Sequence, residues 1–199
     1  MLGATAIFAV ASLIGSPYPE LAPLQNLPTL LVIACAWLAL RKVSFSDASV
    51  ASFALFLALH TLGGRYIYSN VPYDAWIASL GLPTLQETFG FTRNHYDRLV
   101  HFSFGFLMLL PVAEGLSRFT SLSRAWATYV AIEFILAGSA LYELFEWGLT
   151  LVMAGEGADA YNGQQGDMWD AQKDMALAFA GALSAFFIAK ISSTAARRR

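Results

Sequence analysis

Apolar runs of the length that crosses a membrane are the feature that most constrains this chain. About 20 consecutive apolar residues cross a bilayer as an α-helix, and several runs approach or exceed that length. We therefore predict an all-α, polytopic transmembrane bundle formed by a single domain, residues 1–199. The six expected spans are at about 2–15, 28–40, 47–64, 96–117, 125–153 and 170–191.

The composition agrees with a membrane location. The chain is 57% hydrophobic and 13% charged, against about 25% charged residues in soluble proteins. This leaves too little polar surface for a soluble domain. The formal net charge of −2 gives no basis for a nucleic-acid partner. The expected partner is the lipid bilayer, and no feature of the sequence indicates an oligomeric state.

The segments around the spans are less regular. The first apolar run, residues 2–15, is short for a span, and a cleaved signal peptide is the alternative. No lysine or arginine precedes it and no clear cleavage site follows, so we expect a short first helix. Residues 16–28 are rich in proline and predict turns. Residues 65–95 form the longest piece outside the spans. They predict a short interfacial helix near 71–77, because Tyr and Trp favour that level of the membrane.

The positions of lysine and arginine predict that both termini are cytoplasmic, because cytoplasmic loops carry an excess of these residues. With the amino terminus inside, eight of the 12 basic residues fall on the inner side. The eight are Arg41, Lys42, Arg118, Arg124, Lys190, Arg197, Arg198 and Arg199, and the four on the outer side are Arg65, Arg93, Arg98 and Lys173.

This topology brings ionisable residues of four segments to one depth, in the outer third of the membrane. Asp97 and His101 are four residues apart and Glu143 and Glu146 are three apart, so each pair shares a helix face. The stretch before and into the last span adds three carboxylates within eight residues. The residues expected in one outer pocket are His60, Asp97, His101, Glu143, Glu146, Asp167, Asp170 and Asp174.

Six carboxylates in a poorly solvated pocket must keep some protons or be neutralised by cations. Oxygen ligands with one or two imidazoles suit Mg²⁺, Mn²⁺, Ca²⁺ or Zn²⁺. We therefore expect a divalent metal ion, whose identity the sequence leaves open. The predicted ligands are Asp97, His101, Glu143, Asp170 and Asp174, with His60 as a further candidate.

Each of these residues also has a structural interpretation. His60 is more often a hydrogen-bonded packing residue than a ligand. Glu143 and Glu146 would suit the interface beside Trp147, and Asp167 would suit a helix cap. The convergence of four segments is what favours a site.

A few residues outside the pocket carry further expectations. Glu114 and Glu133 lie deeper, towards the inner side, and Glu133 is either a structural hydrogen-bond partner or part of a proton path. Gly163, Gly166 and the glycine pair at 63–64 are expected in tight turns.

Three motifs carry a family resemblance. They are the segment from Arg93 to Phe102 with its following Gly-Phe, the Tyr-Glu-x-x-Glu-Trp of residues 142–147, and the Gly-x-Gln-Gly-Asp-x-Trp-Asp-x-Gln-x-Asp-Met of residues 163–175. Together they resemble the motifs of the YjdF-like bacterial inner-membrane proteins, in the same order. The resemblance covers roughly residues 55–190, and Arg65 departs from it, because a smaller side chain or an imidazole is expected there.

The resemblance implies a multi-pass protein of the bacterial inner membrane, but no reaction, because the function of that family is unknown. A more distant likeness is to VanZ-like membrane proteins, which show Asp-x-x-x-His at one span, an acid on the next and spaced aspartates at a third. That likeness is an analogy between patterns.

Three classes of function fit these features. The first is a metal-dependent enzyme that acts on a lipid or lipid-linked phosphate, in which Glu146 or Asp167 is a general base and Arg98 clamps the substrate anion. The second is a cation or proton transporter or channel that uses the same acids and Glu133. The third is a non-catalytic membrane assembly or structural protein, whose carboxylates would all be paired with basic side chains.

Overall fold

The computed structural model describes residues 1–152 and 163–196, and within these residues all the regular elements are helices. Five of them, α2, α3, α6, α7 and α9, are long and apolar enough to cross a membrane. The predicted all-α, multi-pass architecture is confirmed. The helices are α1 (Leu2–Leu13), α2 (Ala22–Leu40), α3 (Asp47–Tyr66), α4 (Tyr73–Ser79), α5 (Leu85–Phe89), α6 (Tyr96–Phe119), α7 (Arg124–Val152) and α9 (Asp170–Ala196).

The first predicted span is a helix, but a short one. Its 12 residues extend about 18 Å at 1.5 Å per residue, less than the thickness of a bilayer core. Over residues 1–152 and 163–196 there are thus five helices of spanning length and a shorter apolar helix, where six spans were predicted.

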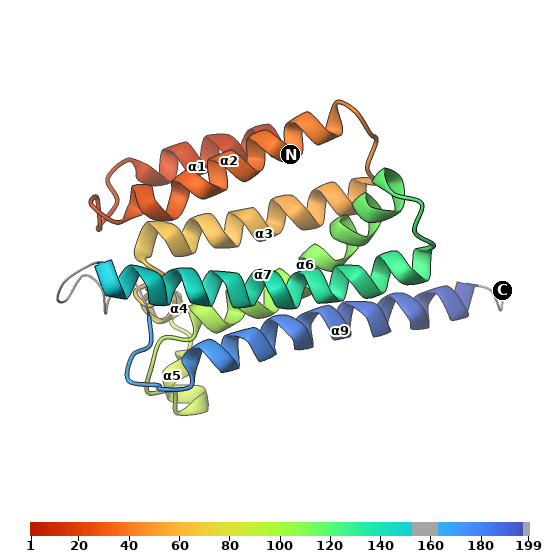
Figure 1. The fold of residues 1–199 in the computed structure, drawn as a ribbon. Helices are drawn as coiled ribbons and strands as arrows, with labels where there is room; N and C mark the ends of the chain where they lie inside the picture. The colour runs from red at the N-terminus through yellow and green to blue at the C-terminus, as the bar shows by residue number, and fades with distance from the viewer. Residues whose placement is uncertain (153–162, 197–199) are drawn as a thin grey trace.

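The long helices lie side by side around α6 (Figure 1). Helix α6 packs against α3, α7 and α9, and α3 in turn packs against α1 and α2. The short helices α4 and α5 lie at the end of the bundle where α3 and α7 finish and α6 and α9 begin (Figure 1). We call this the site end, because the expected polar residues fall on these four helix ends.

Helices α6 and α9 form the closest contact of the bundle, and glycine makes it possible. A Cβ atom on Gly105 would lie 1.8 Å from the carbonyl oxygen of Ala178, and one on Gly181 would lie 2.1 Å from that of Phe102. Small residues let transmembrane helices approach until their backbones touch. The contact holds the start of α6 beside the start of α9.

Helix α2 begins earlier than predicted. Residues 16–28 were expected to be turns, yet the helix starts at Ala22 and contains Pro28. Pro23 is in the first turn, where a backbone N–H needs no partner within the helix. Pro28 removes one internal hydrogen bond and is nevertheless accommodated, as prolines often are in transmembrane helices.

The segment between α3 and α6 contains the predicted interfacial helix, α4, and a second short helix, α5, that was not predicted. Helix α5 begins with a capping box, in which the Thr84 hydroxyl accepts from the Glu87 N–H and the Glu87 carboxylate accepts from the Thr84 N–H. The prediction of a turn at 63–64 was wrong, because both glycines lie inside α3. They are needed for packing, since a Cβ atom on Gly63 would lie 2.6 Å from the Tyr68 ring.

The opposite end of the bundle is fixed by Glu114. Its carboxylate accepts hydrogen bonds from the Ser46 N–H and hydroxyl, at 2.9 and 2.7 Å, and from the Ser49 hydroxyl. Arg118, one turn later, donates to the same carboxylate at 2.5 Å. Glu114 therefore joins the start of α3 to the end of α6.

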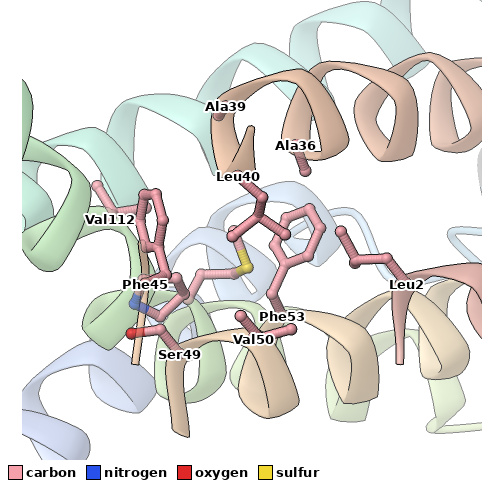
Figure 2. Close-up of a pocket in the computed structure, with 11 residues that line it drawn as sticks. Leu2, Ala36, Ala39, Leu40, Phe45, Ser49, Val50, Phe53 and Val112 are labelled. Atoms are coloured by element: carbon pink, nitrogen blue, oxygen red, sulfur yellow. The ribbon is translucent and has the colours of Figure 1, made fainter. Parts of the chain in front are cut away.

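An apolar cavity of about 190 Å³ lies near this end, between α1, α2, α3 and α6. Figure 2 shows Leu2, Leu40, Phe53 and Val112 among the side chains that line it.

Candidate functional site

His101 lies at the centre of the polar residues at the site end. Its Nε2 is 3.3 Å from Glu143 Oε1 on α7 and 3.6 Å from Asp97 Oδ1, one turn earlier on α6. Its Nδ1 is 3.2 Å from the hydroxyl oxygen of Ser139. The ring therefore presents one nitrogen to carboxylates and the other to a hydroxyl group.

Asp174 on α9 completes a compact group with Asp97 and His101. One ligand atom of each lies within 4.8 Å of the other two, and the three residues are 1–6% exposed. Two ligands on opposite sides of a divalent ion are about 4–5 Å apart. The spacing therefore suits one cation between α6 and α9.

Three atoms around this group are buried without a hydrogen-bond partner in the described part of the chain. They are Asp174 Oδ1, Glu143 Oε1 and Arg98 Nε. Most buried polar atoms in native proteins have a partner, so each exception calls for an explanation. Here two acceptors and one donor lack a hydrogen bond at the site end, and the Glu143 oxygen has only its 3.3 Å contact with His101 Nε2.

A second set of charges lies beside the first, and its acidic and basic side chains form ion pairs. Arg93 donates to both oxygens of Asp170, at 2.5 and 3.2 Å. Asp167 forms ion pairs with Arg98 and with Lys173, the latter at 2.6 Å. The structure therefore places Asp170, a predicted metal ligand, and Asp167, a predicted general base, with basic side chains rather than with His101.

Arg93 was not among the predicted site residues, yet it organises this part of the structure. Besides Asp170, its guanidinium donates to the carbonyl oxygens of Gly163 and Gln164, each at 3.2 Å. Gln165 accepts from the Asn94 N–H at 2.8 Å and donates back to the Asn94 carbonyl at 3.0 Å. The signal in the sequence was the position of Arg93 within the first family-like motif, although spacing alone gave it no role.

The loop that these bonds hold closes over Asp97. Gly163 and Gly166 have φ values of +66° and +83°, so the predicted turns are confirmed. A Cβ atom on Gly163 would lie 2.9 Å from the Ser69 hydroxyl oxygen and 3.8 Å from Asp97 Oδ2. Only glycine lets the loop come this close.

Asp167 is strongly held in its charged form. The hydrogen bond from Lys173, followed by those from the Trp169 N–H and from Arg98, lowers the pKa of Asp167 to about 2. Nearby, burial and then the positive charges of Arg98 and Arg93 lower the pKa of His95. The positive charges of Lys173 and Arg98 thus favour the ionised form of Asp167, and those of Arg98 and Arg93 add to burial in favouring the neutral form of His95.

Two other predicted residues are not members of the compact group, although the Glu146 carboxyl group is close enough to Asp97 and Glu143 for their charges to interact. His60 Nδ1 is hydrogen-bonded to the Tyr68 hydroxyl, which supports its structural interpretation. Ile67 and Tyr68 reach this position through φ values of +52° and +42°, which are unusual for residues other than glycine. Glu146 is 4% exposed, one turn beyond Glu143.

Arg65, where the sequence departs from the family-like pattern, has a structural role. Its guanidinium donates to the carbonyl oxygens of Ser12, Ile14 and Gly15, at 2.6, 3.0 and 2.9 Å. It thereby satisfies carbonyl groups at the end of α1. Its hydrogen bonds go to these carbonyl groups rather than to the carboxylates of the site end.

Comparison with known proteins agrees with these features. Residues 1–194 match the family described as "Predicted membrane protein (DUF2238)". The inner membrane protein YjdF of Escherichia coli (strain K12) is 34% identical over 173 residues, which cover 86% of this chain and 78% of that protein. No solved structure matches the chain. The relative and the five apolar helices confirm the predicted multi-pass, inner-membrane location, and the chain belongs to the DUF2238 family of predicted membrane proteins.

Proposed function

We propose that this protein is a metal-dependent enzyme that hydrolyses a phosphate ester of a membrane lipid or of a lipid-linked compound. The observation that carries the proposal is the set of unsatisfied atoms at the site end. Asp174 Oδ1 and Glu143 Oε1 are buried acceptors and Arg98 Nε is a buried donor. A divalent cation would satisfy the two acceptors, and a phosphate oxygen would satisfy the donor.

The donor set fits a hard divalent ion. Asp97, His101 and Asp174 would hold it, and Glu143, whose Oε1 is 3.3 Å from His101 Nε2, is the fourth ligand. Asp170 supports the site through Arg93. When bound, such an ion polarises a phosphoryl oxygen and acidifies water.

The remaining roles fall to residues around the cation ligands. Arg98 orients the phosphate through its guanidinium. Glu146 accepts a proton from the water that attacks phosphorus, the bond from phosphorus to the ester oxygen breaks, and the proton passes to the leaving alcohol. Asp167 holds Arg98 and Lys173 in place.

The two other classes of function fit the structure less well. A transporter would need a polar path from His101 towards the opposite end. Among the described residues, the core along that direction is the apolar cluster of Leu109, Ala131, Ile135, Ala178 and Ala182, and Glu133 is exposed on the outside of the bundle. A purely structural role would leave the carboxylates paired, as Asp167 and Asp170 are, but Asp174 and Glu143 retain unsatisfied oxygens.

The proposal is tested with purified protein in detergent. Metal content and the binding of Mg²⁺, Mn²⁺, Ca²⁺ and Zn²⁺ are measured together with phosphate release from the phosphate monoester of a two-chain lipid and from a single-chain alkyl phosphate. Asp174→Asn should lose metal binding and lower phosphate release by about 100-fold or more.

Glu133→Gln is the matched control, because it removes one carboxylate from α7 outside the cluster. It should bind metal and release phosphate like the wild type, whereas a proton path through Glu133 predicts its loss of function. The proposal is wrong if the wild type binds none of the four metals, or if Asp174→Asn binds them equally well.

A further inference from the structure

A second cavity, of about 360 Å³, lies inside the bundle between α2, α3, α6 and α7. Its size is within the roughly 300–1,000 Å³ of small-molecule sites. Its lining changes along its length. His60, His101, Ser139 and Tyr142 line the site end, whereas Phe53 and Met108 lie about two helical turns away along their helices. A molecule with one polar end and an apolar body would match this lining.

The cavity borders the compact group of Asp97, His101 and Asp174 at one side chain. His101 belongs to that group and also lines the cavity. Ser139, which contacts His101 Nδ1 at 3.2 Å, lines the cavity as well. An occupant whose polar end lies at the acids would therefore extend its remaining length past His101 into the bundle.

The cavity opens sideways between α2 and α7. Val32 on α2 and Phe134 on α7 both line it, yet they are 44% and 55% exposed. Over the described residues α2 and α7 barely touch each other, apart from contacts near the site end such as the 3.4 Å hydrogen bond from the Tyr142 hydroxyl to Gln25 Oε1. Because both helices are long enough to cross the membrane, this opening faces hydrocarbon.

The apolar path continues beyond this cavity. Phe53 and Met108 line both it and the cavity of Figure 2, so the side chains of these two residues separate the two spaces. Val112 on α6 lines the cavity of Figure 2. From His101 to Val112 the path follows α6 for about 16 Å. Such a path suits a flexible chain better than a compact apolar group.

We propose that the two cavities hold the hydrocarbon chain of the phosphorylated lipid on which the site acts, and that the chain enters between α2 and α7. This assignment rests on the proposed function for its phosphate end, which lies at Arg98 and the acidic group. The substrate is thereby an amphiphile taken directly from the bilayer, with its reacting phosphate at the membrane surface and its chain inside the protein.

Photolabelling tests the proposal. The probe is a hexadecyl phosphate that carries a diazirine near its methyl end, added to full-length protein in detergent micelles. After irradiation we expect peptide mapping to find adducts at Phe53, Phe104 and Met108. Val32→Trp should fill the opening and lower this labelling by about tenfold.

Val10→Trp is the matched control, because Val10 is 52% exposed on α1 and lines neither cavity. It should label like the wild type, and so also shows that an added tryptophan does not unfold the protein. Equal labelling of the Val32→Trp and Val10→Trp variants, or adducts confined to outward-facing residues such as Phe187, would overturn the proposal.

Two further measurements complete the test. One distinguishes a bound substrate chain from any membrane chain, and the other distinguishes failure of this proposal from failure of the proposed function. The same probe with a hydroxyl in place of the phosphate should label the cavity less, and equal labelling would mean that the cavity holds any membrane chain, which overturns the substrate assignment. Labelling is also carried out in a chelator and with Asp174→Asn, where it should persist. A wild-type protein that binds none of the four metals thus contradicts the proposed function, whereas a wild-type protein without cavity labelling contradicts the chain assignment.

Discussion

Two aspartates one turn apart on α9 have opposite surroundings. Asp170 is bound by the two terminal guanidinium nitrogens of Arg93, while Asp174 retains an oxygen without a partner at 1% exposure. The difference arises from Arg93, which precedes α6 and reaches only the first turn of α9. The paired aspartate therefore fixes the loop, and the other keeps an acceptor without a hydrogen bond.

Replacing Arg93 should therefore destabilise the protein more than its ion-pair distance alone suggests. The side chains of Arg93 and Asp170 are 9% and 4% exposed, and removing one partner of a buried pair costs about 3–5 kcal/mol. We expect Arg93→Ala to lose this amount. Arg93→Lys should recover only part of it, because lysine cannot bind both carboxylate oxygens and two carbonyls from one planar group.

The free energy of unfolding is measured by titrating sodium dodecyl sulfate into mixed micelles. Lys173→Ala is the control, because the Lys173 side chain is 49% exposed in its pair with Asp167, and exposed pairs contribute about 0–1 kcal/mol. Equal losses for Arg93→Ala and Lys173→Ala would show that the Arg93 network is not a major part of the stability.

At the scale of helices, the contact between α6 and α9 holds the site together. It depends on Gly105 and Gly181, because each lies against a carbonyl oxygen of the other helix. Asp97 and His101 follow the start of α6, and Asp174 follows the start of α9. A change in the spacing of these two helices therefore changes the spacing of the three side chains.

Gly105→Ala should separate α6 and α9 and lower the free energy of unfolding by at least about 1–3 kcal/mol, the usual cost of overpacking. Gly115→Ala is a control on the same helix, since its Cβ atom would meet the Phe45 ring at an ordinary 3.5 Å. That variant should be neutral or slightly stabilised, because alanine favours helix over glycine. Equal thermal unfolding temperatures for the Gly105→Ala and Gly115→Ala variants would show that the backbones of α6 and α9 are not in close contact at Gly105.

Hydropathy predicted the long helices well and the segments that connect them less well. The span at 96–117 became α6, ending two residues later, because a continuous apolar run has one favourable structure in lipid. The expected turns before Pro28 are partly helix, because packing in a bundle tolerates proline that propensity disfavours. The predicted end of the fifth span at residue 153 lies just outside the described residues.

The sequence predicted which residues of the site lie near one another, but not which of them pair with each other. Helix spacing and topology brought together Asp97, His101 and Glu143, which indeed meet. The split between Asp170 and Asp174 depends on where Arg93 reaches from an irregular segment, and no periodicity encodes that reach. The backbone contact at Gly105 was likewise not predicted, because a glycine in an apolar run does not reveal which helix lies against it.

At the scale of the whole molecule, the direction of the bundle in the membrane remains a prediction. The distribution of lysine and arginine predicts that the site end faces outwards and that both termini are cytoplasmic. The predicted direction determines from which side water and a soluble product would exchange with the site.

Single cysteines introduced into the Cys35→Ala variant test the direction of the bundle in the membrane of intact cells. Ser79→Cys lies at the end of α4, at the site end, and Ser121→Cys lies in the connection between α6 and α7 at the other end; both positions are exposed. A membrane-impermeant maleimide should label Ser79→Cys in intact cells, and Ser121→Cys only after the cells are permeabilised. The reverse pattern would place the site end in the cytoplasm.

The glycine contact has one further consequence, for ion selectivity. Asp97, His101 and Asp174 project from two helices whose backbones already touch. The distance between the ligand atoms on α6 and the one on α9 therefore cannot shorten by moving the helices closer. A cation bound there must fit a gap of nearly fixed width, which discriminates by ionic radius. Glu143 projects from α7, on which a Cβ atom at Gly138 would meet the Phe104 ring of α6 rather than its backbone. Radius discrimination would thus reside in α6 and α9, and α7 would supply the adjustable ligand.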